Sequence, residues 1–207
     1  MIVIWGFKVR FAVTARGMFF CPQCGGDRPY AQKKGRRWFT LFFIPVVPLN
    51  HVGEEFVECD TCHAAYSLAA LRMPTTAALG EQLLTATREA VIWLLRSAGP
   101  VTPAAAAVAR DVLARAAGSP WSDEALQADL AGLDVCGLAG RLGSLAPALN
   151  EHGKETFLGN CARVAVAAGP LTEEQNRMLH HIAASLGMSQ AHALGVITQA
   201  TDADRLG

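Results

Sequence analysis

The sequence has no excess charge of either sign. Its 18 lysines and arginines balance 18 aspartates and glutamates over 207 residues. The charges are distributed unevenly along the chain, because residues 1–66 carry eight basic and five acidic side chains, whereas residues 67–207 carry ten basic and thirteen acidic ones. Neither imbalance is large enough to indicate a polyanionic partner from net charge alone.

A hydrophobic run long enough to cross a membrane is also missing. The apolar run at residues 39–49 has eleven residues and two prolines, whereas a spanning helix needs about 20 apolar residues for the ~30 Å hydrocarbon core. We interpret the run as strand and turn, and expect no membrane association. Residues 1–11 lack the basic and long apolar segments of an export signal, so we expect a cytoplasmic location.

No catalytic motif is evident. The sequence shows no Ser-His-Asp order, glycine-rich phosphate loop or paired-carboxylate arrangement. Cys136 and Cys161 stand alone among small apolar residues, which predicts buried core cysteines. His180 and His181 are adjacent on a predicted helix and cannot both face one pocket. We therefore expect no enzyme activity and no small-molecule substrate, with a hydrolase as the weakest alternative.

What the sequence does contain is two CxxC pairs, Cys21 and Cys24 in CPQC and Cys59 and Cys62 in CDTC. Two thiolates from one tight turn can bind a metal at about 2.3 Å, and Zn²⁺ takes four such ligands in closed structural sites. The 34 intervening residues suit a zinc ribbon, in which a β-hairpin fills the interval. We predict one structural Zn²⁺ on these four thiolates, in a reducing compartment.

The second pair also permits another interpretation. With His63 it spells CxxCH, the attachment motif of c-type haem. Haem attachment needs an exported chain and leaves no role for Cys21 and Cys24, so zinc is favoured. His63 is then predicted to be a bystander just past the cysteine turn.

Three short strands are predicted in the ribbon, at residues 1–13, 38–44 and 54–58, where Ile, Val, Trp and Phe concentrate. Residues 33–37, with the sequence KKGRR, predict an exposed hairpin turn before the second strand. The two prolines that follow this strand are expected to end it.

In residues 33–39, basic residues precede aromatic ones. Such a cluster is typical of nucleic-acid contact, in which cations match phosphates and rings stack on bases. The favoured alternative is a solvated turn whose aromatic side chains point into the ribbon core. The residues concerned are Lys33, Lys34, Arg36 and Arg37, followed by Trp38 and Phe39.

From Thr76 onward, glycine and proline turn signals divide a helical sequence into about seven segments. The turn AGPVTP at residues 98–103 recurs as AGPLTE at residues 168–173. In both copies a threonine is placed to cap the next helix, and Thr172 with Gln175 predicts a capping box. This internal repeat indicates a pseudo-symmetric all-α bundle.

The first third of the chain resembles a zinc-ribbon family found at the start of many small bacterial and fungal proteins. The resemblance rests on CPQC, then KKGRRWFTLFFIPVVPL, then CDTC followed by Tyr66. It implies a structural metal and no catalysis.

The helical body resembles the TerB-like family, which is named for tellurite resistance and related to the N-terminal domain of a membrane-anchored co-chaperone. The resemblance rests on the two segments VIWLLRSAGPVTPAAAAVARDVLARAAG and VAVAAGPLTEEQNRMLHHIAASLGMS. Acidic residues at the family's turns are thought to bind metal. Here Ala98, Ala105, Ala168 and Gln175 replace them, which leaves almost no oxygen ligands for a hard cation.

We therefore expect a zinc ribbon at residues 1–66, a linker at 67–75 and an all-α TerB-like domain of about seven helices at 76–207. The expected function is that of a non-catalytic binding or adaptor protein with a protein partner, linked by resemblance to tellurite, metal or envelope stress. Nucleic-acid binding through the basic cluster is the alternative.

Overall fold

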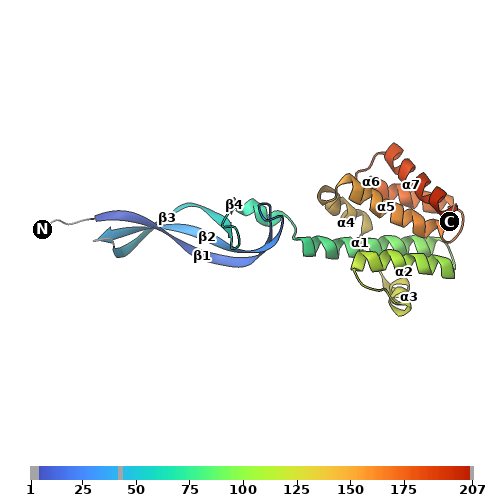
Figure 1. The fold of residues 1–207 in the computed structure, drawn as a ribbon, viewed down its shortest axis with the longest axis horizontal. Coiled ribbons are helices and arrows are strands. Elements are labelled where there is room, and N and C mark those ends of the chain that lie inside the picture. The colour runs from blue at the N-terminus through green and yellow to red at the C-terminus, as the bar shows by residue number, and fades with distance from the viewer. Residues whose placement is uncertain (1–4, 42–43, 206–207) are drawn as a thin grey trace. The chain divides into compact units, whose positions relative to one another are not determined.

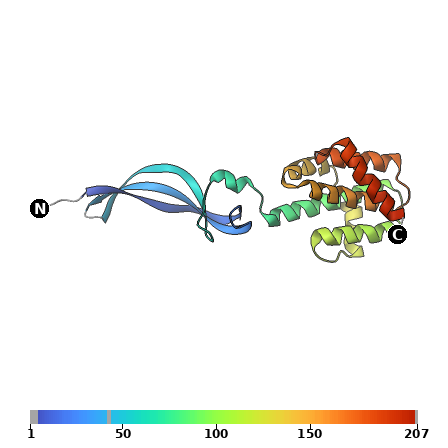
Figure 2. The same cartoon turned by 45° about the horizontal axis from the view of Figure 1, so that its top comes forward.

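The computed structural model describes residues 5–41 and 44–205. The chain divides into two compact units, Met1–Ala78 and Leu79–Gly207, which we call the ribbon unit and the helical unit. Strands form the first and helices the second (Figures 1 and 2). The predicted fold class, a small β module followed by an all-α bundle, is thereby confirmed.

An antiparallel sheet with the strand order β1-β2-β3-β4 forms the ribbon unit. Three strands are long and twist together away from the cysteine-bearing turns (Figure 1). The prediction of three short strands is therefore wrong, although Phe42 and Phe43 of the second predicted strand lie outside the described residues. The strands are β1 (Trp5–Cys21), β2 (Gly26–Leu41), β3 (Ile44–Cys59) and β4 (Ala65–Ser67).

Residues 33–37 do not form the predicted hairpin turn. They lie within β2 and pair with β1 on one side and β3 on the other. Gly35, which suggested a turn, instead permits a close backbone approach, because a Cβ atom there would lie 2.6 Å from the carbonyl oxygen of Val52.

The prolines of the apolar run do not end a strand either. Pro45 and Pro48 lie within β3, opposite Thr40 and Trp38 of β2. Because β4 pairs only with residues 56–58 of β3, both prolines lie on an edge segment, where a missing N–H group is tolerated. Register shifts interrupt the β2–β3 ladder nearby.

The core of the ribbon unit lies at its cysteine end. Phe19 is buried there, with the rings of Tyr30 and Tyr66 at centroid distances of 5.6 and 5.8 Å. Trp38 and Phe39 are half-buried but do not belong to this core, contrary to prediction. The fully buried core side chains are Phe19, Cys21, Val57 and Cys59.

Residues 67–75, predicted as a linker, contain the end of β4 and the 3₁₀-helix η1 (Leu68–Arg72). Ala70 and Leu71 of η1 pack against the ribbon core. This segment is therefore structured and contributes apolar contacts to a core that is otherwise very small.

The ribbon unit also includes the first residues of α1 (Thr76–Ser97). The carboxylate of Asp27 accepts hydrogen bonds from the N–H groups of Thr76 and Ala77, at 2.9 and 3.2 Å, and from the Thr76 hydroxyl. These bonds, chiefly the one from the hydroxyl, hold the pKa of Asp27 below its usual value. Asp27 thus caps a helix that begins 49 residues away in the sequence.

Seven α-helices lie in the described residues, as many as the turn signals predict. After α1 they are α2 (Pro103–Ala117), α3 (Asp123–Gly132), α4 (Leu138–Leu145), α5 (Glu151–Val166), α6 (Glu173–Ser185) and α7 (Gln190–Arg205). A short 3₁₀-helix, η2 (Ala146–Ala148), separates α4 from α5.

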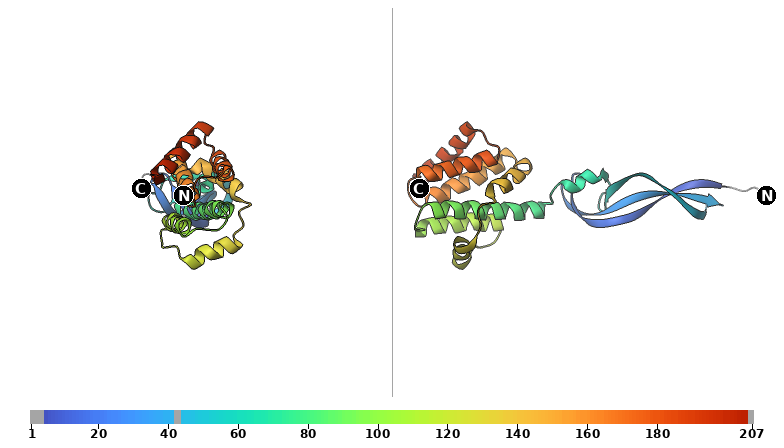
Figure 3. Two further views of the ribbon diagram at one scale, coloured as in Figure 1. Left: turned by 90° about the vertical axis from the view of Figure 1, so that its right-hand side faces the viewer. Right: turned by 180° about the vertical axis from the view of Figure 1, so that it is seen from behind.

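Two apolar clusters form the core of the helical unit. In the larger one α1 packs with α4, α5, α6 and α7, and in the smaller one with α2, α3 and the end of α5. Helix α5 packs beside α7 and α6 (Figures 1 and 3). Helices α1 and α5 contribute to both clusters, so they join the two halves of this unit.

The two repeated turns carry the predicted caps. The Thr102 hydroxyl accepts a hydrogen bond from the N–H of Ala105 at 3.2 Å. The Thr172 hydroxyl accepts one from the N–H of Gln175, whose side chain accepts one from the Thr172 N–H, both at 3.1 Å. The capping box is confirmed, and it is typical of a well-defined helix start.

Two carboxylates are buried among the described residues of the helical unit, and each is paired with an arginine. Glu89, 4 % exposed, accepts hydrogen bonds of 2.9 to 3.2 Å from Arg141. Asp129, 6 % exposed, accepts two from Arg88. These bonds raise the pKa of both arginines and hold α1 to α4 and α3.

The two isolated cysteines differ from one another. Cys161 is buried as predicted, and burial raises its pKa to about 12. The prediction that Cys136 is buried is wrong, because it lies exposed in the segment between α3 and α4, with its N–H bonded to the Asp134 carboxylate. Among the described residues, no helix is both long and apolar enough to cross a membrane.

Candidate metal centre

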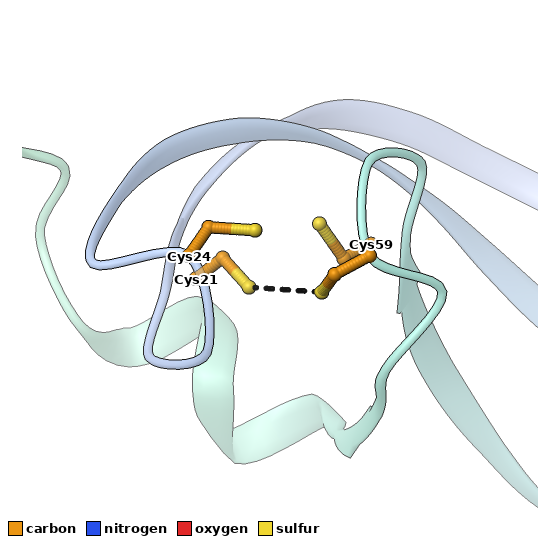
Figure 4. Close-up of side chains that lie close together, drawn as sticks. Cys21, Cys24 and Cys59 are labelled. Carbon is orange, nitrogen blue, oxygen red and sulfur yellow. Dashed lines mark hydrogen bonds between the residues drawn. The ribbon is translucent and has the colours of Figure 1, made fainter.

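The structure brings all four predicted ligands together. The sulfur atoms of Cys21, Cys24, Cys59 and Cys62 lie within 4.8 Å of one another, and those of Cys21 and Cys62 are 3.7 Å apart. Figure 4 shows the Cys21 and Cys24 side chains reaching from one loop toward Cys59 on the facing loop. In the described residues these cysteines form the only group of metal-binding side chains so close together.

The two cysteine turns are built alike. The N–H of Gly25 bonds to the carbonyl of Cys21, and the N–H of His63 to that of Cys59, each at 2.9 Å. Gly25 and His63 both adopt the left-handed conformation, with φ of 66° and 59°. Each turn therefore directs two sulfur atoms to one point, and His63 contributes its backbone to the turn.

The sulfur spacing fits zinc. Four ligands at about 2.3 Å in a tetrahedron are separated by about 3.8 Å, close to the 3.7 Å between Cys21 and Cys62. A disulfide would bring two sulfur atoms to about 2.05 Å, and all six cysteines of the chain are free. The residues therefore fit one tetrahedral Zn²⁺.

The close approach of the four thiols shifts the pKa values of two of them. Burial alone would raise the pKa of Cys21, but hydrogen bonds from the Tyr66 hydroxyl, the Cys24 backbone and the other thiols outweigh it and lower this pKa to about 6. Burial and hydrogen bonds to Cys62 and Cys21 raise the pKa of Cys24 to about 12. Neighbouring thiolates repel one another, and a bound divalent cation relieves that repulsion.

Two residues beside the cluster differ in role. The Tyr66 hydroxyl lies 3.6 Å from the Cys21 sulfur and acts as an outer-shell partner. In the sequence, only the position of Tyr66 after CDTC points to this contact. The His63 side chain is 76 % exposed, with its Nδ1 3.7 Å from Glu58, so it lies outside the sulfur cluster.

The basic residues proposed from the sequence do not form one patch. Lys33 pairs with Glu58 at 2.7 Å and Lys34 with Glu55 at 2.9 Å. The Arg36 side chain donates to the Leu49 carbonyl at 3.2 Å, and the Arg37 guanidinium lies 4.0 Å from the centre of the Phe7 ring. Because neighbouring residues of a strand point to opposite faces, these four side chains are divided between both sides of the sheet.

The comparison with known families agrees with this geometry. Residues 19–87 match a zinc-ribbon family. The matched stretch contains all four cysteines, and its end lies within α1. Together with the clustered sulfur atoms, the match supports one structural zinc ion. No curated protein and no solved structure matches the chain.

At this site a metal would stabilise the fold. Cys21 and Cys59 are completely buried, and each lies at the end of a long strand. Zinc would therefore hold the ends of β1 and β3 together at the point where the small ribbon core lies. The tetrahedral site draws all its ligands from the protein, which is typical of structural rather than catalytic zinc.

Proposed function

We propose that this chain is a non-catalytic binding protein, in which zinc shapes the ribbon unit and the helical unit recognises a protein partner. The observation that carries the proposal is the closed sulfur site. Four cysteines from two matching turns fill a tetrahedral coordination shell, and catalytic zinc instead keeps a position open for water or substrate. We further propose a cytoplasmic location, where the thiols stay reduced.

The helical unit supports a TerB-like assignment through its repeated, capped turns. Both turns join a long helix to a threonine-capped one. At two positions where the family has acidic residues, Ala105 is buried and Gln175 is used in the capping box. We propose that this unit has kept the family's arrangement of helices and binds a partner with it, but has lost the family's metal site. A link to tellurite or envelope stress rests on fold-level analogy alone.

Calorimetric titration of the zinc-loaded chain with Ca²⁺ tests whether the helical unit has lost the family's metal site. We expect no binding heat up to about 1 mM, the range of weak calcium modules. Saturable heat that disappears in a Glu173→Gln/Glu174→Gln variant would contradict the proposal. These two glutamates are exposed in the first turn of α6, so their replacement leaves the core intact.

A second candidate function, nucleic-acid binding, is favoured by a different set of cations from the one predicted. In the β1–β2 register, Arg10 lies opposite Arg36 and Lys8 opposite Trp38. Residues opposite one another project from the same face, so three cations surround one half-buried indole ring. Like charges opposed across a ladder repel one another, and a phosphate between them would relieve that repulsion. We call Lys8, Arg10, Arg36 and Trp38 the basic face.

An Arg10→Ala/Arg36→Ala variant tests this alternative. If the basic face binds single-stranded DNA or RNA, the variant should bind at least tenfold more weakly in 50 mM salt. The slope of log affinity against log salt concentration should become less steep by the amount expected for the loss of about two phosphate contacts. Fluorescence anisotropy with a labelled oligonucleotide measures both. Lys33→Ala is the matched control, because Lys33 lies on β2 but pairs with Glu58. Undetectable binding of the unmodified chain, or equal binding by the double variant, would rule this function out.

A further inference from the structure

The face of the sheet opposite the basic face is apolar along most of its length. Alternate residues of β1 and their partners on β2 and β3 project to this side. We call it the apolar face. Its side chains are Trp5, Phe7, Val9, Phe11, Val13, Phe39, Val47, Val52 and Phe56.

These side chains form a packed layer. The rings of Phe7 and Phe39 meet edge to face at 6.0 Å, and those of Phe11 and Phe56 at 5.4 Å. Between them, Gly35 leaves room for the Phe11 ring and Val9, whose atoms lie 3.3 and 3.5 Å from the position of its missing Cβ atom. The layer is therefore ordered before any partner arrives, which lowers the entropic cost of binding.

Within the described residues of the ribbon unit, nothing covers this layer. Trp5 is 65 % exposed, Phe11 58 % and Phe7 50 %, and the four valines are 42 to 48 % exposed. The surface area of a whole aromatic side chain is about 150–250 Å², and that of valine is roughly half as large. Multiplied by the exposed fractions, these areas give an exposed apolar area on the order of 500 Å² for the layer. A patch of about this size matches the largest apolar patch on a typical monomer, and such patches are often binding sites.

Charge indicates what can bind there. Lys8, Arg10 and Arg36 project from the basic face and form no ion pair within the described residues. A nucleic acid or an anionic lipid surface would therefore bind on that side. On the apolar face, Lys33 is neutralised by Glu58 and the Arg37 guanidinium stacks on Phe7. Of these two basic side chains, only Arg37 lacks a carboxylate partner among the described residues, so the apolar face has little charge and fits a partner that is itself largely apolar.

We propose that the partner of the apolar face is the apolar face of a second copy of this chain. Two such sheets would stack about 10 Å apart around a two-fold axis, so that each presents the same patch to the other. Roughly 500 Å² of apolar area per copy supplies most of the ~800 Å² that each partner buries in a standard interface, and homodimer interfaces are about 65 % apolar. This interface is separate from the functions proposed above, because it uses neither the helical unit nor the basic face.

Sedimentation equilibrium of the zinc-loaded full chain from 1 to 100 μM tests the proposal. We expect a monomer–dimer equilibrium that stops at two copies. Trp5→Glu and Phe11→Glu should each weaken dimerisation at least tenfold, since each places a charge in the layer. Ala12→Glu is the matched control, because Ala12 neighbours Phe11 on β1 but points to the other side, and it should dimerise like the unmodified chain. Zinc content and amide chemical-shift dispersion show that each variant is folded.

Three results would overturn the proposal. The first is a folded monomer at 100 μM. The second is a dimer that survives both glutamate substitutions. The third is a chain that stays monomeric in solution but binds vesicles of phosphatidylcholine and phosphatidylserine in a manner that Trp5→Glu abolishes, which would assign the face to a lipid surface.

Discussion

Replacing Cys59 with serine is expected to unfold the ribbon unit while the helical unit stays folded. Cys59 is completely buried and supplies one of four sulfur ligands. The ribbon core has few other buried side chains, and a module of this size rarely folds on apolar burial alone. Structural zinc contributes on the order of 10 kcal/mol in small zinc modules, which exceeds what such a core supplies.

Heteronuclear NMR measures the two units separately. In Cys59→Ser, amide signals from residues 5–75 should collapse to the narrow range of an unfolded chain, while those from residues 79–205 keep their dispersion. Excess chelator should have the same effect on the unmodified protein. Cys136→Ser is the matched control, because Cys136 is exposed and lies outside the sulfur cluster, so its spectrum should match that of the unmodified chain. A folded ribbon in Cys59→Ser would contradict a structural role for zinc.

Replacing Arg141 with alanine is expected to lower the free energy of unfolding of the helical unit by about 2–3 kcal/mol. The substitution leaves the Glu89 carboxylate, 4 % exposed, without its only charged partner among the described residues. Breaking a fully buried pair costs about 3–5 kcal/mol, because the remaining charge is desolvated and uncompensated. Because the Arg141 side chain is 38 % exposed, water can partly replace it, and we expect an effect below that range.

Urea unfolding followed by far-UV circular dichroism measures this effect, since most of the helical signal comes from the helical unit. Arg115→Ala is the matched control, because Arg115 forms an exposed pair with Asp111 on α2 and such pairs contribute less than about 1 kcal/mol. Equal midpoints for both variants would show that burial of Glu89 does not matter. A double variant, Arg141→Leu/Glu89→Leu, should recover much of the loss, because it removes the unpaired charge.

Local patterns allowed part of this structure to be predicted. The spacing of Cys21, Cys24, Cys59 and Cys62 specified a metal site because each CxxC turn fixes two ligands through local geometry. Thr102 and Thr172 were predictable as caps because the bonds they make reach only three residues along the chain. Both features depend on short-range backbone geometry, which the sequence encodes directly.

The features that were missed depend on pairing between distant residues. Gly35 predicted a turn, yet its role follows from Val52 of β3 crossing close to it. Lys8 and Arg10 join Arg36 only because β1 and β2 pair in one register. The apolar residues concentrated at residues 1–13 predict a strand, but they do not show whether another layer covers its apolar side chains. Trp5, Phe7 and Phe11 were expected in a strand, and their exposure is visible only in the folded unit.

The account depends most on the zinc site, and one measurement tests it directly. The chain, purified without chelator, is analysed for metal content and by X-ray absorption at the zinc edge. We predict one zinc ion per chain with four sulfur neighbours at about 2.3 Å and no nitrogen or oxygen neighbour. A content well below one zinc per chain, or a mixed shell in which His63 or water replaces a cysteine, would contradict the closed structural site.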